Sequence, residues 1–292
     1  FMVDPFHVSA LNQTRMKLWE VEAELQGVKP FSAPKLQLEQ YPTSSHIAAH
    51  MIHAMYNAYE DVEGKSVVDM GCGTGMLGIG CSLFGASSVI GLDIDQDALD
   101  IAVENTEHTE TEMDFVRCDL SPSNSSCLRR GFSADTVVMN PPFGTRRKGI
   151  DTIFLRRAME MCSGAIYSLH KSSTRDYLTS TLEKWGGEVE VVAQLKFDIP
   201  AMYSFHKKKT MDVEVDLIRC DVSSLYERRQ KELEETGVDS WQASFSGIDP
   251  PDSDGDSDSD AIKRGNGQER RGGRGGRGRG SSARRGGGRG KR

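Results

Sequence analysis

The chain has 292 residues, and 43 acidic against 36 basic side chains give it a net charge of −7 at pH 7. The charge is uneven, because 12 basic residues and one glutamate follow position 260 and six aspartates lie within 249–260, which leaves residues 1–248 with a net charge of −12. An acidic body excludes a fold that binds nucleic acid non-specifically over one face, since such binding needs basic side chains spread over that face. The body is long enough for one domain, and no stretch approaches the roughly 20 apolar residues of a membrane span.

Two helices are expected before the first strand. Apolar residues recur at helical spacing among charges within 11–26, which predicts an amphipathic helix. A second helix is expected over 45–59, with Thr43 or Ser44 as its N-cap.

From residue 66 onward, short apolar segments alternate with segments of helical periodicity. This alternation is typical of a doubly wound α/β fold with a parallel sheet. The expected strands are 66–70, 88–92, 114–117, 136–139 and 165–169, and the expected helices between them are 76–84, 95–107 and 152–162.

The last strands break this rhythm. Residues 188–197 and 211–220 are β-rich and are joined by 200–210, and in the second segment apolar residues alternate with acidic ones. We therefore expect an antiparallel hairpin at one side of the parallel sheet, with seven strands in all. A seven-stranded Rossmann-like sheet with this ending resembles that of the S-adenosylmethionine-dependent methyltransferases.

These patterns divide the chain into four parts. We expect a helical extension over 1–34, a methyltransferase domain over 35–222 and a short helical or linker segment over 223–248. Residues 249–292 are an Asp/Ser run followed by Arg-Gly repeats, and such compositions bury too little apolar surface to offset chain entropy. We expect this tail to be disordered.

A glycine-rich loop follows the first expected strand. Gly71, Gly73 and Gly75 allow positive φ angles and a close approach of a ligand to the backbone at the start of a helix. Asp93 ends the next strand, where it is well placed to bind two ribose hydroxyls, and Asp95 is the alternative. The loop also matches the G-x-G-x-x-G pattern of dinucleotide-binding enzymes, so by itself it leaves NAD open as the cofactor.

The sequence Asn140-Pro141-Pro142-Phe143 directly follows the fourth expected strand. The Asn140 side-chain oxygen and the Pro141 carbonyl can accept the two hydrogens of a planar amino group and turn its lone pair toward a methyl donor. Phe143 offers a ring on which a base can stack, which is worth about 1–3 kcal/mol. The pattern fits adenine N6, cytosine N4 and the glutamine side-chain amide equally.

Five segments make the resemblance more specific, and the resemblance as a whole covers about residues 11–221. They resemble the methyltransferase-like five family, the adenine-N6 methyltransferases of 18S ribosomal RNA. The segments are 35–49 (KLQLEQYPTSSHIAA), 140–145 (NPPFGT), 167–175 (YSLHKSSTR), 205–209 (FHKKK) and 213–219 (VEVDLIR).

The resemblance implies methylation of one adenine in small-subunit ribosomal RNA, with S-adenosylmethionine as the cofactor. It implies that Asn140, Pro141, Pro142 and Phe143 are catalytic. Together with Gly73 of the loop, the residues expected to line the cofactor are Gln40, Thr43, Gly71, Thr74, Met76, Asp93, Asp119 and Leu120.

The resemblance also implies a partner, a small zinc-containing activator protein. In the usual strand order, residues 113–117 form a free sheet edge, and such an edge invites strand addition by another chain. A location in the nucleus, nucleolus and cytoplasm is expected with it.

Basic residues near the expected cleft are candidates for contacts with RNA phosphates. Lys171 follows His170 at the end of the fifth expected strand. The others lie in the connection of the hairpin: His206, Lys207, Lys208 and Lys209.

No metal site is expected in the chain. His46, His50 and His53 share one stripe of a helix, but no cysteine or carboxylate motif accompanies them. The six cysteines show no C-x-x-C spacing, and we expect them to be reduced.

Two other functions stay open on the sequence. The same chemistry serves protein glutamine-N5 and DNA adenine-N6 methyltransferases. Alternatively, an inactive methyltransferase fold delivers the Arg-Gly tail to RNA as a binding module.

Overall fold

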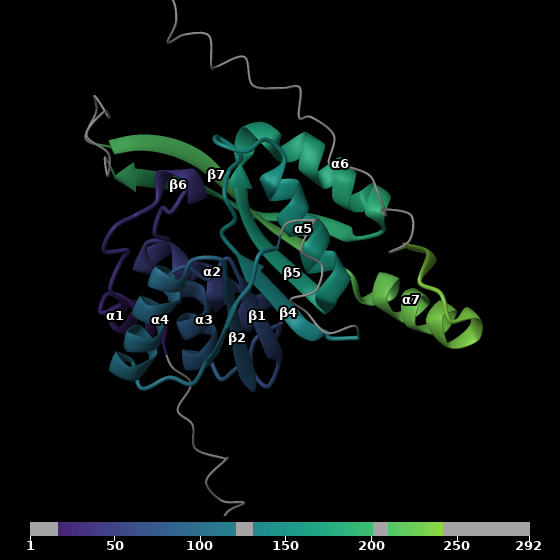
Figure 1. The fold of residues 1–292 in the computed structure, drawn as a ribbon, viewed down its shortest axis with the longest axis horizontal. Coiled ribbons are helices and arrows are strands. Elements are labelled where there is room, and N and C mark those ends of the chain that lie inside the picture. The colour runs from purple at the N-terminus through teal and green to yellow at the C-terminus, as the bar shows by residue number, and fades with distance from the viewer. Residues whose placement is uncertain (1–16, 121–130, 201–209, 242–292) are drawn as a thin grey trace, which may run out of the picture. The chain divides into compact units, whose positions relative to one another are not determined.

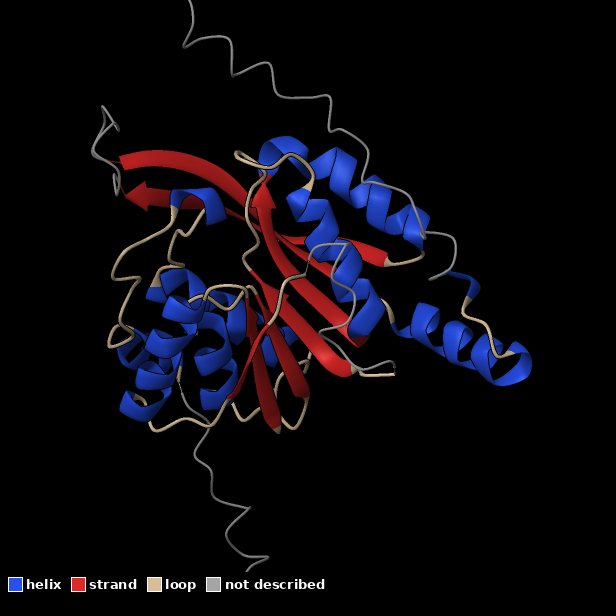
Figure 2. Cartoon of the chain, viewed as in Figure 1, coloured by secondary structure: helices blue, strands red, loops and turns tan. Residues whose placement is uncertain are grey.

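One mixed seven-stranded sheet organises the residues that the computed structural model describes, 17–120, 131–200 and 210–241 (Figure 1, Figure 2). The strand order is β3-β2-β1-β4-β5-β7-β6. The strands are β1 (Ser66–Met70), β2 (Ser88–Asp93), β3 (Asp114–Arg117), β4 (Ala134–Met139), β5 (Cys162–Lys171), β6 (Glu188–Pro200) and β7 (Thr210–Asp221).

Five strands are parallel and the last two are not, as the sequence predicts. β1 pairs in parallel with both β2 and β4, whereas β7 runs antiparallel to β5 and β6. The chain order reverses between β1 and β4, and ligands of such sheets bind outside the carboxyl ends of the strands at this reversal. The glycine loop and the Asn-Pro-Pro-Phe segment follow these two strands and are therefore neighbours.

Helices cover both faces of the sheet and bury a separate core on each. The first core holds side chains of α1 (Leu18–Leu25), α2 (Ser45–Ala58) and α3 (Met76–Leu83). The second holds side chains of α5 (Ile150–Met161), α6 (Arg175–Trp185) and α7 (Ser223–Thr236). The remaining α-helix of the described residues, α4 (Gln96–His108), packs against β2 and β3.

The segments that flank residues 35–222 pack onto this body. Val21 and Leu25 of α1 are fully buried in the first core, and Leu225 of α7 is buried in the second. The expected tail, 249–292, and the expected RNA contacts from His206 to Lys209 lie outside the described residues.

The helix α6 has no counterpart among the sequence predictions. It buries only Leu178 and Leu182, one turn apart, so its apolar stripe is too thin to stand out from the surrounding polar residues. Its end carries a readable signal, since Gly186 at the C-cap adopts φ 100°, a left-handed conformation that favours glycine.

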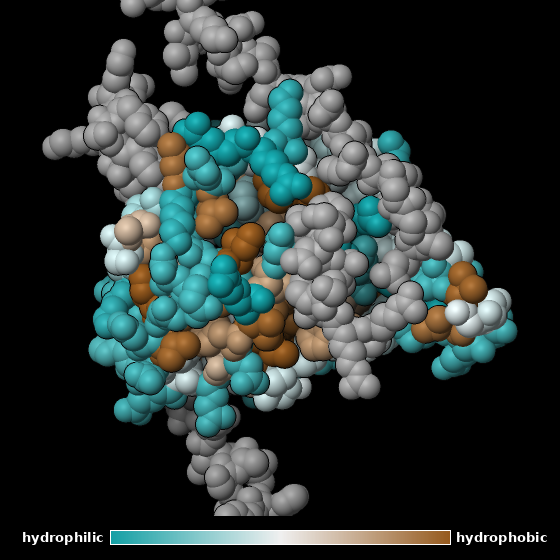
Figure 3. Space-filling view, in the orientation of Figure 1, coloured by the Kyte–Doolittle hydropathy of each residue, from teal (hydrophilic) through white to brown (hydrophobic). Residues whose placement is uncertain are grey.

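The described helices include none that is long and apolar enough to cross a membrane. The face shown in Figure 3 is largely hydrophilic, and its hydrophobic residues are scattered. Cys72, Cys81, Cys162 and Cys220 are free and buried. The expectation of reduced thiols is wrong for Cys118, which is disulfide-bonded, because sequence spacing does not reveal which sulfur atoms the fold brings together.

Candidate active site

The glycine loop connects β1 to α3 and leaves no room for side chains at two positions. Gly71 and Gly73 have φ angles of 72° and 54°. A Cβ atom on Gly71 would lie 2.9 Å from the Phe154 ring, and one on Gly73 would lie 2.7 Å from the Phe31 ring. Both aromatic rings line the cavity above the loop, so the loop presents backbone to a ligand rather than side chains.

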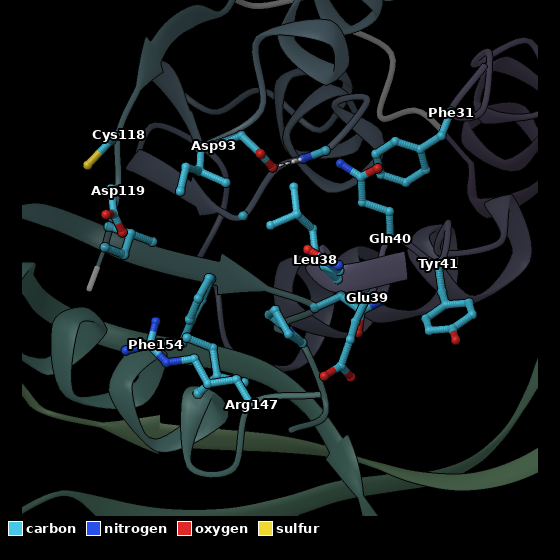
Figure 4. A pocket seen from close by; sticks show the side chains of 18 residues that line it. Phe31, Leu38, Glu39, Gln40, Tyr41, Asp93, Cys118, Asp119, Arg147 and Phe154 are labelled. Carbon is cyan, nitrogen blue, oxygen red and sulfur yellow. Dashed lines mark hydrogen bonds between the residues drawn. The ribbon is translucent and has the colours of Figure 1, made fainter. Parts of the chain in front are cut away.

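Asp93 reaches this loop from the end of β2. Its Oδ2 accepts the backbone N–H of Gly73 at 2.8 Å, the bond drawn dashed in Figure 4, and its Oδ1 accepts that of Asp95 at 2.9 Å. Burial raises the pKa of the Asp93 carboxyl, although the two backbone bonds oppose the shift. Each oxygen keeps a further lone pair, so the carboxylate can accept hydroxyl groups of a ligand.

A short segment before α2 closes the opposite side of the cavity. It contains the turn η3 (Leu36–Leu38) and is tied down by Gln40, whose Nε2 donates to Asp95 Oδ2 at 2.7 Å and whose Oε1 accepts Lys35 N–H at 2.7 Å. Asp95 also accepts from the Lys35 ammonium. The alternative ribose ligand, Asp95, therefore holds the segment and is absent from the cavity lining.

Asn140 follows β4 and faces the same space. Its Nδ2 donates to the buried hydroxyl of Thr43 at 2.9 Å, which leaves the side-chain Oδ1 available as an acceptor. Phe143 packs edge-on against Phe197 of β6, with ring centroids 6.2 Å apart.

Two adjoining cavities occupy this end of the sheet. The larger measures about 210 Å³, and Figure 4 shows side chains from its opposite walls, Asp93 and Asp119 on one and Leu38 and Gln40 on the other. It is also lined by Gly71, Gly73, Leu120, Asn140 and Pro142. The smaller measures about 10 Å³, and its lining is Glu39, Tyr41, Asn140, Pro141 and Phe143.

Other candidates from the sequence lie outside both cavities. Thr43 contacts the site through Asn140, and Thr74 is buried with its carbonyl accepting from Asn105 Nδ2 at 2.9 Å. Met76 begins α3 and packs against the first core. Lys171 ends β5, whereas His170 is 1% exposed and hydrogen-bonded to Ser168 Oγ, so its side chain does not face a substrate.

Sequence reasoning missed three features of the site. Phe31 and Phe154 cover the loop, but isolated phenylalanines look like core residues in a sequence. Arg146, Arg147 and Lys148 are exposed in the loop after Phe143, and the RRK triplet was the signal for them. Glu39 lines both cavities, and its position before Gln40 was the only indication.

Asp69 of β1 lies beneath the loop. Its carboxyl is fully enclosed, and Oδ2 accepts the Gly78 backbone N–H at 2.8 Å. Burial raises the pKa of Asp69 to about 7. This carboxyl joins β1 to α3 and supports the loop from below.

In the folded chain, a carboxylate from another helix lies beside the histidines of α2, which the sequence does not reveal. Glu22 of α1 lies 3.1 Å from His46 Nδ1, and His46 and His50 have ring centroids 4.3 Å apart. The three side chains could hold a metal ion, but the two histidines are exposed and the group lies away from both cavities. His53 is absent from it and packs near Phe84.

The chain is similar in sequence to known methyltransferases. The family model for ribosomal protein L11 methyltransferase (PrmA) matches residues 41–140. The chain is 48% identical over 206 residues to rRNA N(6)-adenosine-methyltransferase METTL5 of Danio rerio, covering 70% of this chain and 98% of that protein. It is 46% identical to rRNA N(6)-adenosine-methyltransferase Mettl5 of Drosophila melanogaster, covering 72% of this chain and 99% of the other.

A solved structure agrees with these sequence relatives. The crystal structure of a proposed RNA methyltransferase from Pyrococcus horikoshii superimposes with a TM-score of 0.62 at 34% identity. The match covers 70% of this chain and 98% of the archaeal one.

Proposed function

The chain belongs to the rRNA N6-adenosine-methyltransferase family, and from this premise we propose that it methylates N6 of one adenosine in small-subunit (18S) ribosomal RNA with S-adenosylmethionine as the donor. Membership of a methyltransferase family removes the NAD enzyme as an alternative. The observation that carries the proposal is Asn140, whose amide nitrogen is held by Thr43 so that its oxygen is left to accept at the junction of the two cavities.

The larger cavity fits S-adenosylmethionine. The backbone at Gly71 and Gly73 is open to close approach, and a Cβ at either position would collide with an aromatic ring. Asp93 supplies the carboxylate for ribose hydroxyls, and Asp119 and Leu120 line the wall beside it. When bound, the cofactor supplies an electrophilic methyl group on a sulfonium sulfur.

Asn140 and Pro141 prepare the amino group of the target. An exocyclic adenine amine is a weak nucleophile because its lone pair is delocalised into the ring. The Asn140 oxygen and the Pro141 carbonyl accept its hydrogens, localise the lone pair and stabilise the positive charge that develops on nitrogen. Phe143 at the wall of the smaller cavity stacks on the base.

Binding of the base requires movement. The smaller cavity has about the volume of one water molecule, far less than a purine needs. Tyr41 or Phe143 must therefore shift when the target adenosine, rotated out of its RNA stack, enters.

A cationic loop at the mouth supports an RNA substrate. Arg146, Arg147 and Lys148 are exposed beside the cavities, and Arg147 lines the larger one. Their charges are suited to the phosphates that flank the target nucleotide. We propose that Lys171 and the segment from His206 to Lys209 extend this contact.

The edge strand β3 supports the proposed partner, a small zinc-containing activator protein. Within the described part of the chain, β3 pairs with β2 on one side only, and at the outer edge of the sheet it offers backbone groups for strand addition. Three exposed large hydrophobic residues lie on β3 or on the segments beside it, namely Ile94, Val103 and Val116. We propose a heterodimer through this edge, and a nuclear and cytoplasmic location for the complex.

The product identifies the function. Purified protein with its activator is incubated with unmodified small-subunit RNA and isotopically labelled S-adenosylmethionine, and the nucleosides are analysed by mass spectrometry. We expect labelled N6-methyladenosine at one position. Labelled N4-methylcytidine, or no labelled nucleoside, would contradict the proposal.

Labelling of a cell extract separates the alternatives. Label in a cell extract that resists RNase and is released by protease would favour glutamine methylation, and label lost with DNase would favour DNA adenine. A chain ending at Gly247 tests the binding-module alternative: loss of RNA binding together with an inactive body would support that alternative.

A further inference from the structure

Glu39 lies at the wall between the two cavities and belongs to both linings. It follows η3, next to Gln40, and its side chain is 8% exposed. One carboxylate oxygen, Oε1, accepts the backbone N–H of Arg146 at 2.8 Å, which joins this segment to the loop after Phe143. Figure 4 shows the Glu39 side chain extending from the η3 segment away from Asp93 and Asp119.

The second oxygen of this carboxylate has no hydrogen-bond partner among the described residues. Oε2 is buried and unpaired. A buried polar atom without a partner costs about 1–3 kcal/mol, and more when it carries charge, so such atoms point to a missing ligand.

The backbone conformation of Glu39 is also energetically unfavourable. Its φ and ψ of 52° and 42° are left-handed, a conformation that costs a non-glycine residue about 1–2 kcal/mol. Strained backbones of this kind are found at functional sites, where the surrounding structure enforces them. Two independent costs therefore fall on one residue at the site.

The smaller cavity otherwise lacks a charge that matches the reaction. Asn140 and Pro141 are neutral acceptors, and Glu39 is the one carboxylate among the described residues of the lining. Transfer of a methyl group to an amine leaves positive charge on nitrogen, and a preorganised anion in a dry site stabilises that charge better than a neutral dipole.

We propose that Glu39 contacts the target adenosine. Its free Oε2 shares one of the two amine hydrogens with the Pro141 carbonyl, as the second acceptor of a bifurcated hydrogen bond, while Asn140 accepts the other hydrogen. Its negative charge stabilises the positive charge that develops on that nitrogen. The inference rests on the proposed function and adds to it a third substrate-contacting group beside Asn140 and Pro141.

A purely structural role for Glu39 makes a different prediction. If the carboxylate only holds the Arg146 loop, the amide of Glu39→Gln does so equally well, because its oxygen still accepts the Arg146 N–H. Glutamine also keeps the volume of the side chain and the same backbone strain. The substitution therefore removes the charge and little else.

The test compares the wild-type full-length chain with Glu39→Gln and with Glu104→Gln, each together with the activator protein. Glu104→Gln is a control that neutralises an exposed carboxylate on α4 paired to Lys29. We expect kcat for N6-methyladenosine formation to fall about tenfold to a hundredfold in Glu39→Gln and to stay unchanged in Glu104→Gln. The Kd for S-adenosylmethionine, measured by calorimetry, should stay within about twofold of wild type in both variants, which corresponds to a change in binding free energy of at most ~0.4 kcal/mol.

A binding measurement identifies the contacted group. A short RNA carrying the target adenosine is compared with one carrying purine riboside there, which lacks the amine. Wild type should prefer the adenosine RNA, and Glu39→Gln should lose at least about fivefold of that preference.

Three results would overturn the inference. Turnover by Glu39→Gln within about twofold of wild type would show that the carboxylate only holds the loop that contains Arg146. Weaker S-adenosylmethionine binding with an unchanged RNA preference would assign Glu39 to the cofactor. Failure of the wild-type chain to form N6-methyladenosine would overturn the proposed function, and the inference with it.

Discussion

Two polar clusters in this molecule differ in how completely their hydrogen bonds are satisfied. On the α2 side of the sheet, Arg219 of β7 donates to Asp61 at 3.1 and 3.2 Å, to Tyr167 at 3.0 Å and to Asp221 at 3.0 Å. Tyr167 in turn donates to Asp61 at 2.6 Å, and the guanidinium lies 4.7 Å from the Tyr59 ring centroid. At the site, by contrast, Glu39 Oε2 has no partner among the described residues and Asn140 Oδ1 is left to accept.

The contrast separates a structural cluster from a functional one. Charges that are fully paired inside a fold contribute to stability and leave nothing with which to bind a ligand. Charges and acceptors left unpaired cost stability, and they persist where a ligand supplies the missing partner. Substitutions in the two clusters should therefore affect different measurements.

The largest effect is expected at Asn140. Asn140→Ala removes the acceptor for the target amine, and we expect the methylation rate to fall by at least about a hundredfold. Binding of S-adenosylmethionine should survive, because the glycine loop and Asp93 are untouched. Asn57→Ala, a change on an exposed part of α2, is the matched control, and wild-type turnover by Asn140→Ala would refute the role of Asn140.

A somewhat smaller effect is expected at Asp93. Asp93→Ala removes the carboxylate that would accept two ribose hydroxyls, and hydrogen bonds to a charged group are worth about 1.5–3 kcal/mol. The Kd for S-adenosylmethionine should rise about tenfold to a hundredfold, as measured by calorimetry. Asp97→Ala removes an exposed aspartate nearby and should change little, and equal affinities in the two variants would contradict the assignment.

The structural cluster should respond in stability rather than activity. Arg219→Met keeps a long unbranched side chain but removes the guanidinium from the Tyr59 ring and leaves the Asp61 carboxylate with Tyr167 as its donor within this cluster. We expect the free energy of unfolding to fall by about 2 kcal/mol in denaturant titrations, less than for a fully buried pair. Cofactor affinity should be unchanged. A loss of cofactor affinity with unchanged stability would contradict a purely structural role for the Arg219 cluster.

The smallest effect concerns pH. Burial raises the pKa of Asp69 to about 7, above the usual value of 3.8, so the folded state binds the extra proton between these pH values. The stabilisation is therefore full below pH 3.8 and is lost as pH rises to about 7. In Asp69→Asn, which can still accept the Gly78 N–H, the fall in unfolding free energy between about pH 5 and pH 6 should shrink by on the order of 1 kcal/mol. An identical pH profile for both proteins would exclude this titration.

Much of the fold was predictable because its signals are local. Strand β1 and strand β3 have the predicted boundaries, and Ser44 is the N-cap of α2, with its hydroxyl accepting from Ile47 N–H. The antiparallel β6 and β7 also follow from alternation in the sequence. Helix α6 escaped prediction because two buried leucines make a weak periodicity.

Less of the site was predictable. Asp93 ends β2 and Asn140 follows β4, the two strands on either side of β1, and the sequence places each of them next to a recognisable motif. Phe31 and Glu39 come from the segment before α2, where no periodicity indicates that the chain folds over the glycine loop. The structure was also needed to decide whether Asp93 or Asp95 is available to bind the ribose. Only the hydrogen bonds show that the Asp95 carboxylate already accepts from Lys35 and Gln40.

The sequence by itself determined the alternation of strands and helices, the glycine loop, the acceptor motif after β4 and the family. These depend on residues close together in the chain, whose spacing is fixed by covalent geometry. Only the tertiary structure decided which polar atoms meet a partner and which do not, because Glu39 and Arg146, or Asp61 and Arg219, are far apart in sequence and adjacent only after the core has packed. The unpaired oxygen of Glu39, on which the further inference depends, is a property of that packing.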